Sequence, residues 1–141
     1  VTPRLERHKD VLVLDSAPYY ALFPHVQAVV HHGGIGTTAQ CLRAGKPMLV
    51  CPVLYPVGDQ QFWGDQAVKK GVGVKPLPVE KITCESFLNS VAQLLCDDNL
   101  YENSERLGGL ISQESGVEKA LEVIVSTVEK QRREALVFND L

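Results

Sequence analysis

The sequence predicts an α/β domain built around a parallel β-sheet. Short apolar runs alternate with longer segments of helical periodicity, and this alternation is typical of β-α-β units. The apolar runs are continuous rather than interleaved with polar residues, as expected of strands that are covered on both faces. The chain has 141 residues, 45% of them hydrophobic and 22% charged, which suits one domain with a single core. We therefore treat residues 1–141 as one domain.

Four strands and five helices are predicted along the chain. The strands are the Val- and Leu-rich runs at 11–14, 28–30, 48–51 and 72–74. The helices are the segments of helical periodicity at 37–44, 60–70, 84–96, 99–111 and 117–133. Gly45 and Gly71 are typical residues to end the first two helices, and Asp59 is well placed to cap the amino end of the second.

Composition excludes several classes of function. The net charge of −3 and the scattered Lys and Arg residues argue against a nucleic-acid partner. No apolar run approaches the length of a transmembrane segment and no signal-peptide pattern opens the chain, so we expect a cytoplasmic protein. The cysteines form no CxxC pair, which predicts small core residues in a reducing compartment rather than a disulfide or zinc framework. They are Cys41, Cys51, Cys84 and Cys96.

A glycine-rich turn, HHGGIGTT at 31–38, joins the predicted strand 28–30 to the next helix. The first N–H groups of a helix have no intrahelical partner and the helix dipole is positive there, so this arrangement predicts an anion site. Glycines let a phosphate approach the backbone, while Thr37 and His31 offer further donors. An alternative stays open, in which the glycines serve only the tight turn and the histidines bond within the protein.

A second polar turn carries Asp59 and Gln60 after the predicted strand 48–51. In a parallel sheet both turns leave the same carboxyl edge, where open α/β sheets bind their ligands. A carboxylate beside an amide suits the vicinal hydroxyl groups of a sugar. Phosphate donors on one turn and hydroxyl acceptors on the next therefore predict a nucleotide-sugar site, although both residues could instead serve only to cap the helix that follows.

The stretch HHGGIGTTAQCLRAGKPMLVCP, followed by GDQQFWGDQ, closely resembles the donor-binding signature of the family 1 UDP-glycosyltransferases, which have the GT-B fold. The nearest branch is the sterol 3-beta-glucosyltransferase-like one. The resemblance implies a Rossmann-like domain, the C-terminal half of an enzyme that transfers a hexose from UDP-glucose or a similar UDP-sugar. It further implies inversion at the sugar, no metal or other cofactor, and a lipophilic acceptor such as a sterol.

The family's pattern assigns roles to individual positions. His31 matches the histidine that contacts the donor diphosphate, and the pair Asp59 and Gln60 matches the residues that hold the sugar hydroxyls. Ala17 falls where the family's backbone hydrogen-bonds the uracil. The positions of the phosphate-cradling turn are Gly34, Gly36 and Thr37.

Two departures from the family's pattern concern the uracil base and the sugar of the donor. The tryptophan that stacks on uracil in the plant branch is replaced at about Ser16, and Tyr19 or Tyr20 are the candidate substitutes. The turn VLYPVGDQ is longer than the family's usual FFGDQ, which leaves the identity of the hexose open.

The resemblance places further parts of the enzyme outside this sequence. In the family, the acceptor site and the catalytic base lie in an N-terminal domain, and a strand-helix-strand unit precedes the position of residues 11–14. The chain begins with Val1 rather than methionine, so we expect a partial domain without a catalytic residue and without turnover on its own. In the full-length protein, a peripheral association with membranes is an alternative to a purely cytoplasmic location.

The last predicted helix carries an apolar stripe that the pattern assigns to the core. In the family, C-terminal helices reach back across the interdomain cleft, so a partly exposed stripe would mark the surface that the N-terminal domain covers. The stripe consists of Val117, Ala120, Leu121, Ile124, Val125 and Val128.

Two rival functions stay open. One is a non-catalytic nucleotide-binding or interaction module, or a subunit that needs a separate acceptor-domain partner. The other is an inactive remnant held together as a homo-oligomer.

Overall fold

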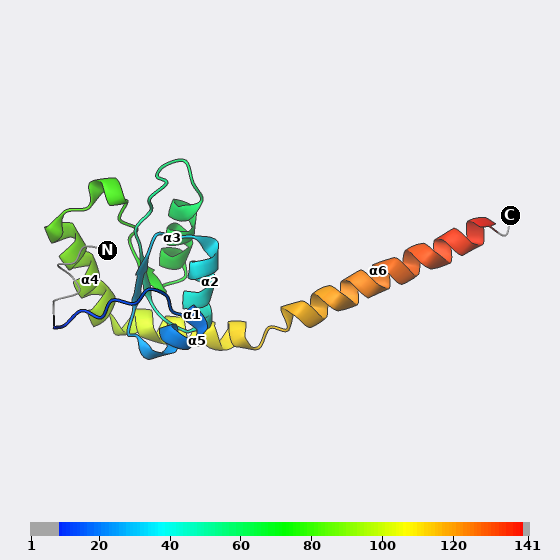
Figure 1. Ribbon diagram of the computed structural model, residues 1–141, viewed down its shortest axis with the longest axis horizontal. Coiled ribbons are helices and arrows are strands. Elements are labelled where there is room, and N and C mark those ends of the chain that lie inside the picture. Colours follow the sequence, from blue (N-terminus) through cyan, green and yellow to red (C-terminus); the bar gives the residue numbers. More distant parts are fainter. Residues whose placement is uncertain (1–8, 140–141) are drawn as a thin grey trace.

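A three-stranded parallel sheet lies at the centre of the computed structural model, which describes residues 9–139 (Figure 1). The strand order is β1–β2–β3, so each strand pairs with the next along the chain. Val29 of β1 aligns with Met48 of β2, and Met48 aligns with Gly73 of β3. The strands are β1 (Val29–His31), β2 (Met48–Val50) and β3 (Gly73–Val74). Three of the four predicted strands and the predicted parallel α/β fold are thus confirmed.

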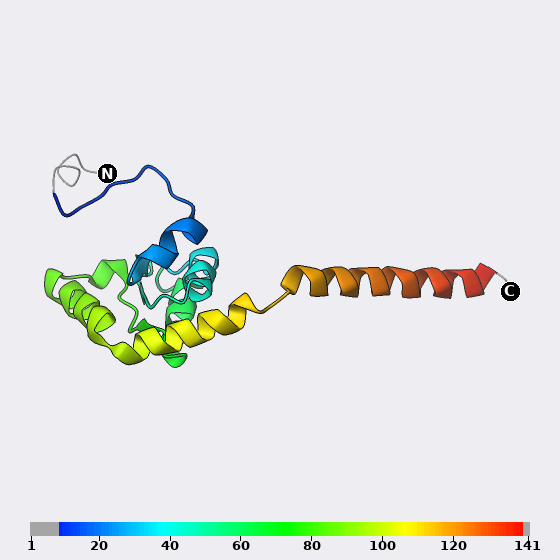
Figure 2. The same ribbon diagram turned by 90° about the horizontal axis from the view of Figure 1, so that it is seen from below.

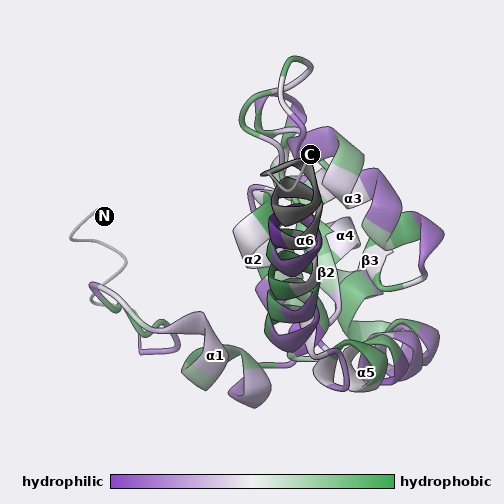
Figure 3. Cartoon of the chain, turned by 90° about the vertical axis from the view of Figure 1, so that its right-hand side faces the viewer, coloured by the Kyte–Doolittle hydropathy of each residue, from purple (hydrophilic) through white to green (hydrophobic). Residues whose placement is uncertain are grey.

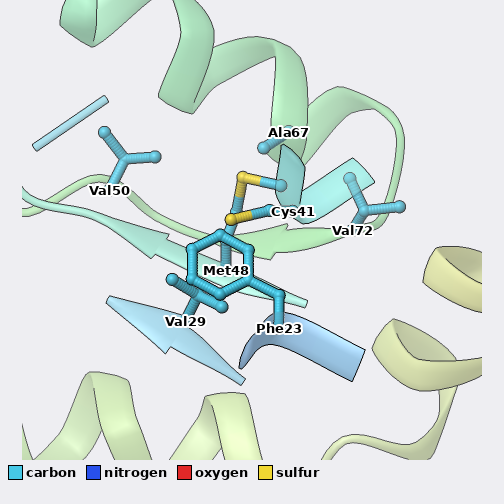
Figure 4. Close-up of a cluster of buried hydrophobic side chains, with 7 residues drawn as sticks. All are labelled: Phe23, Val29, Cys41, Met48, Val50, Ala67 and Val72. Atoms are coloured by element: carbon cyan, nitrogen blue, oxygen red, sulfur yellow. The ribbon is translucent and has the colours of Figure 1, made fainter. Parts of the chain in front are cut away.

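Helices cover both faces of the sheet because its central strand is apolar on both sides. Met48 and Val50 face one way and pack with Cys41 of α2 (Ile35–Arg43) and Ala67 of α3 (Gln60–Lys69), as Figure 4 shows. Leu49, between them, faces the other way and packs with Leu94 of α4 (Cys84–Cys96). The continuous apolar run therefore has the cause that the sequence suggested: a strand buried from above and below.

Helix α5 (Asp98–Ser112) passes along the amino-terminal edge of the strands and joins the two halves of the core (Figure 1). Its Leu100 belongs to the cluster under α4, whereas its Leu107 packs against the cluster under α2 and α3. The predicted helix ends are confirmed, since Gly45 and Gly71 adopt φ angles of 64° and 67°, a left-handed conformation that glycine enters most readily.

Residues 11–14 do not form the predicted strand. The run is extended but Leu12 is 82% exposed, and it lies away from the sheet in Figures 2 and 3. A strand is stabilised by the N–H and C=O groups of a neighbouring strand, and the described residues place none beside this run. Two short helical turns that the sequence did not predict follow it, α1 (Tyr19–Leu22) and η1 (Phe23–His25). Phe23 anchors them in the core at 5% exposure.

The last helix, α6 (Gly116–Asn139), projects from the domain, and the prediction that its apolar stripe is core is wrong (Figures 1 and 2). Val117 is 80% exposed, and Leu121 and Ile124 are each 60% exposed. The cause is the position of the helix beyond α5, where the rest of the described chain does not cover it. Within residues 9–139, no helix combines the length and the apolar character that a bilayer crossing requires.

Half of the cysteine prediction is also wrong. Cys41 and Cys51 are buried, as expected of small core residues, and burial raises the pKa of the Cys41 thiol to about 12. Cys84 and Cys96 are exposed at the two ends of α4. All four thiols are free.

Candidate functional site

The two polar turns leave the sheet at its carboxyl edge, as the parallel arrangement requires (Figure 1). The first connects β1 to α2 at 32–34, and the second connects β2 to α3 at 51–59. Because β1 and β2 are direct neighbours, the turns lie side by side. The sequence-predicted phosphate and sugar positions therefore share one edge of the fold.

Helix α2 begins with backbone donors that no group of the described residues satisfies. Its amino-terminal cap is Gly34, which has no side chain to accept a hydrogen bond. The Thr38 N–H and hydroxyl groups both donate to the Gly34 carbonyl, each at 3.0 Å. Among the hydrogen bonds of residues 9–139, none starts from the N–H groups of Ile35, Gly36 or Thr37. Three aligned donors at the positive end of the helix dipole suit an anion.

His31 adds a fourth unsatisfied donor. Its Nδ1 accepts a hydrogen bond from the Gly33 N–H at 3.1 Å. Burial, with a smaller contribution from the charge of His32, lowers the pKa of His31 to about 4, so the imidazole is neutral at pH 7 and carries its proton on Nε2. That Nε2 is buried and has no hydrogen-bond partner among the described residues. A buried donor without an acceptor is costly, and an anionic oxygen would satisfy it.

The glycines of the turn have different physical roles. Gly33 has a φ angle of 93°, and a Cβ there would lie 2.6 Å from Val50 Cγ1, so the backbone and the packing both demand glycine. A Cβ on Gly34 would meet the His32 ring at 2.6 Å. A Cβ on Gly36 would meet nothing within 4 Å. The fold thus explains Gly33, whereas a Cβ on Gly34 would meet only the exposed His32 side chain, which can move, and Gly36 leaves open space in the first turn of α2.

The neighbouring turn holds Asp59 and Gln60 in unlike environments. Asp59 occupies the amino-terminal cap of α3, but its side chain makes no capping bond, so the predicted capping role is wrong. Its Oδ2 instead accepts from the Trp63 indole N–H at 2.9 Å, and the residue is exposed. Gln60 is only 7% exposed, and its Oε1 accepts from the backbone N–H groups of Val53 and Leu54 at 2.8 and 2.9 Å. These two bonds hold the start of the long turn.

The residue predicted to bind the uracil base, Ala17, lines a pocket outside the two polar turns. Ala17 is half-buried and lines a pocket of about 400 Å³ together with Ser16, Tyr19 and Leu22. Of the two candidate stacking residues, only Tyr19 lines this pocket, where its ring stacks on Phe23 with centroids 4.7 Å apart. Base recognition by Ala17 stays a prediction, as do the donor contacts of the other six site residues.

Two contacts of the site were missed in the sequence. The bond from Trp63 to Asp59 joins residues four apart on α3, and this helical spacing could have suggested it. The clamp from Gln60 to the turn at 53–54 bridges residues six and seven apart through an irregular loop, and no spacing rule indicates it. Within residues 9–139, no group of three or more His, Cys, Asp or Glu side chains is arranged to hold a metal ion.

Known proteins with the same architecture are glycosyltransferases. The family model described as "Erythromycin biosynthesis protein CIII-like, C-terminal domain" matches residues 7–130. A sterol 3-beta-glucosyltransferase of Arabidopsis thaliana is 39% identical over 118 residues, which make up 83% of this chain and 18% of that protein. An O-mycaminosyltylonolide 6-deoxyallosyltransferase of Streptomyces fradiae is 37% identical over 115 residues, or 82% of this chain and 26% of that protein.

Solved structures show the same fold. The glycosyltransferase VinC, crystallised in complex with dTDP, superposes with a TM-score of 0.78 at 22% identity, covering 87% of this chain and 30% of VinC. The glycosyltransferase SnogD from Streptomyces nogalater gives a TM-score of 0.63 at 26% identity, covering 81% of this chain and 29% of SnogD.

The chain spans about a quarter or less of the length of the curated relatives named here. Since the family model covers most of the chain, the protein belongs to the erythromycin biosynthesis protein CIII-like C-terminal domain family of GT-B glycosyltransferases.

Proposed function

We propose that this chain is the donor-binding part of an inverting glycosyltransferase that uses a UDP-sugar, with UDP-glucose as the favoured donor, and a lipophilic acceptor such as a sterol. Membership of the family supports glycosyl transfer, and the relatives include sterol 3-beta-glucosyltransferases of plants and fungi. The nucleotide in the VinC structure is a deoxythymidine diphosphate, a close chemical analogue of UDP.

The observation that carries the proposal is the group of unsatisfied donors at the start of α2. The buried His31 Nε2 and the N–H groups at 35–37 have no acceptor among residues 9–139, and Gly36 leaves room in front of them. A diphosphate supplies the acceptor oxygens and the negative charge that these groups lack. The alternative of a purely conformational turn accounts for Gly33 but leaves the buried His31 proton unexplained.

In the proposed reaction, a base outside this chain takes the proton from the acceptor hydroxyl. The acceptor oxygen then bonds to the anomeric carbon while the bond from that carbon to the diphosphate oxygen breaks, and the electron pair leaves with UDP. His31 donates a hydrogen bond from Nε2 to the departing diphosphate. Each well-aimed donor of this kind contributes about 3–4 kcal/mol to stabilising a developing charge in comparable sites.

The long turn beside Asp59 supports a lipophilic acceptor. Its apolar side chains face solvent, with Val53 56%, Leu54 61% and Val57 93% exposed. Exposed apolar groups next to a polar site are typical of binding surfaces. The ammonium group of Lys81 lies 4.7 Å from the centre of the Tyr55 ring and anchors the middle of the turn.

The exposed stripe of α6 supports an enzyme whose acceptor-binding part packs on this helix. A helix of 24 residues gains most of its stability from packing its apolar face, and Val117, Leu121 and Ile124 have no cover here. The acceptor domain is the partner that we propose for this face. A separate subunit that carries the acceptor site would cover it equally well.

Calorimetric titration of the chain with UDP, UDP-glucose and dTDP tests the proposal. We expect micromolar to millimolar binding of UDP that weakens at least tenfold in His31→Ala. The matched control is His25→Ala, because His25 is exposed at the far end of η1 and away from the unsatisfied donors. Equal UDP affinity in the two variants, or no binding to the unaltered chain, would exclude a diphosphate site at α2.

A further inference from the structure

Trp63 connects Asp59, at the end of the turn at 51–59, to a groove between α2, α3 and α5. Its indole N–H donates to Asp59 Oδ2 at 2.9 Å, while its ring lines an apolar groove of about 280 Å³ between α2, α3 and α5. Thr38 and Leu42 of α2 line the same groove. The ring of Phe62 meets the Trp63 ring edge-on, with centroids 5.0 Å apart. Trp63 thus has a packed body and one polar atom that reaches the exposed carboxylate.

The bond restricts a carboxylate that is otherwise free to rotate. Asp59 is exposed at the cap of α3, and no other hydrogen bond to its side chain occurs among the described residues. A bond from an N–H donor to an ionised carboxylate is stronger than one between neutral groups, and the half-buried indole ring packs edge-on against Phe62. One oxygen of Asp59 is therefore fixed by Trp63, and Oδ1 is left for a ligand.

The groove that Trp63 lines is also bounded by helix α2. Thr38, which lines the groove with Trp63, donates its hydroxyl to the carbonyl of Gly34 at the cap of α2. The groove therefore joins the helix that presents the free N–H groups to the residue that holds Asp59.

We propose that Trp63 is a positioning residue for the donor sugar, because it holds Asp59 so that one carboxylate oxygen faces the hexose while the diphosphate lies on α2. The inference rests on the proposed function and assigns Trp63 a role in discriminating a sugar nucleotide from the bare nucleotide. A purely structural role makes a different prediction: loss of the indole would then weaken UDP and UDP-glucose equally.

The decisive comparison is Trp63→Phe, which keeps an aromatic ring in the groove but removes the donor. We expect UDP affinity to stay within twofold of the unaltered chain, while the ratio of the UDP-glucose to the UDP dissociation constant rises about fivefold. Asp59→Ala should raise the ratio at least as much, because it removes both the acceptor of the indole N–H and the oxygen that faces the sugar, and adding Trp63→Phe to it should raise the ratio no further. Gln61→Leu is the control, since it removes a matched bond between side chains four apart on α3, from Gln61 Nε2 to Asp65 Oδ1 at 2.9 Å, that involves neither Trp63 nor Asp59.

Parallel losses for both ligands, an unchanged ratio in Trp63→Phe, or additive effects in the double variant would each overturn the positioning role while leaving the proposed function intact. Failure of the unaltered chain to bind UDP would instead remove the proposed function, and this inference with it. A second measurement avoids dependence on the folding of Trp63→Phe. Trp63 is the single tryptophan of the chain, so its fluorescence should change with UDP-glucose but not with UDP, and Asp59→Ala should abolish the difference. Identical emission changes with both ligands would also contradict the role.

Discussion

Replacing Gly36 by alanine separates the two explanations of the glycine-rich turn. A Cβ at this position would have no protein atom within 4 Å, and the residue lies in the first turn of α2. Alanine in place of glycine stabilises a helix interior by about 0.5–1 kcal/mol and the first turn by less. A turn that serves conformation alone would therefore tolerate Gly36→Ala, with a melting temperature equal to or slightly above that of the unaltered chain.

A diphosphate site makes the opposite prediction for binding. Side chains of a helix tilt toward its amino end, so the new methyl group would point into the space before the N–H groups at 35–37. A phosphate oxygen there must retreat and lose at least one hydrogen bond between a donor and a charged acceptor. Such a bond contributes about 1.5–3 kcal/mol, so the affinity for UDP should fall roughly 10- to 150-fold.

Calorimetric titration with UDP and thermal unfolding of the same samples measure the two effects together. Gly109→Ala is a matched control, because Gly109 lies in helix α5 and a Cβ there would also meet nothing within 4 Å. We expect Gly109→Ala to raise the melting temperature by a few degrees and to leave UDP affinity unchanged. A diphosphate site at the start of α2 is excluded if Gly36→Ala binds UDP as tightly as Gly109→Ala does.

Three further changes test the surroundings of the turn. His31→Gln should flatten the pH dependence of the free energy of unfolding between about pH 4 and 6.5. Burial, together with the charge of His32, lowers the folded-state pKa of His31 to about 4, so in this range only the unfolded chain gains the proton and stability falls as the pH falls. An unchanged slope in acid titrations followed by circular dichroism would contradict this. Gly33→Ala should destabilise the fold by about 2–4 kcal/mol in urea unfolding, because a φ of 93° and a contact of 2.6 Å both oppose a side chain, and a cost below 1 kcal/mol would disprove the strain. Gln60→Met should leave the amides at 53–54 without their acceptor and speed their hydrogen exchange at least tenfold, whereas unchanged protection would show that the clamp is not formed.

The sheet and its helices could be predicted because their determinants are local. The run around Leu49 is apolar at every position, which marks a strand covered on both faces, and α4 begins and ends at 84 and 96 as predicted. Gly45 and Gly71 end α2 and α3 through a conformation that few other residues adopt. These signals need no knowledge of the rest of the molecule.

The failures share the opposite cause, a dependence on distant neighbours. Residues 11–14 have the composition of a buried strand, yet a strand requires a partner edge and none stands beside them in the described chain. The stripe of α6 has the period of a core helix, but periodicity specifies which face is apolar and not what covers it. Exposure of Cys84 likewise follows from its place at the outer end of α4.

Asp59 and Gln60 show a difference that the motif alone does not predict. As a motif, Asp59 and Gln60 are an equivalent pair of sugar ligands, yet their side chains differ in exposure and in bonding. Gln60 is buried with its amide oxygen committed to the turn at 53–54, and its backbone oxygen lies where a Cβ on Gly33 would approach to 2.8 Å. Gln60 therefore holds the turn at 51–59 against the turn at 32–34, while Asp59 faces solvent and one of its carboxylate oxygens has no hydrogen bond among the described residues. On the proposed function, Gln60 could offer a bound hexose only its amide nitrogen, and we expect the Asp59 carboxylate that Trp63 holds to be the principal acceptor for the sugar hydroxyls.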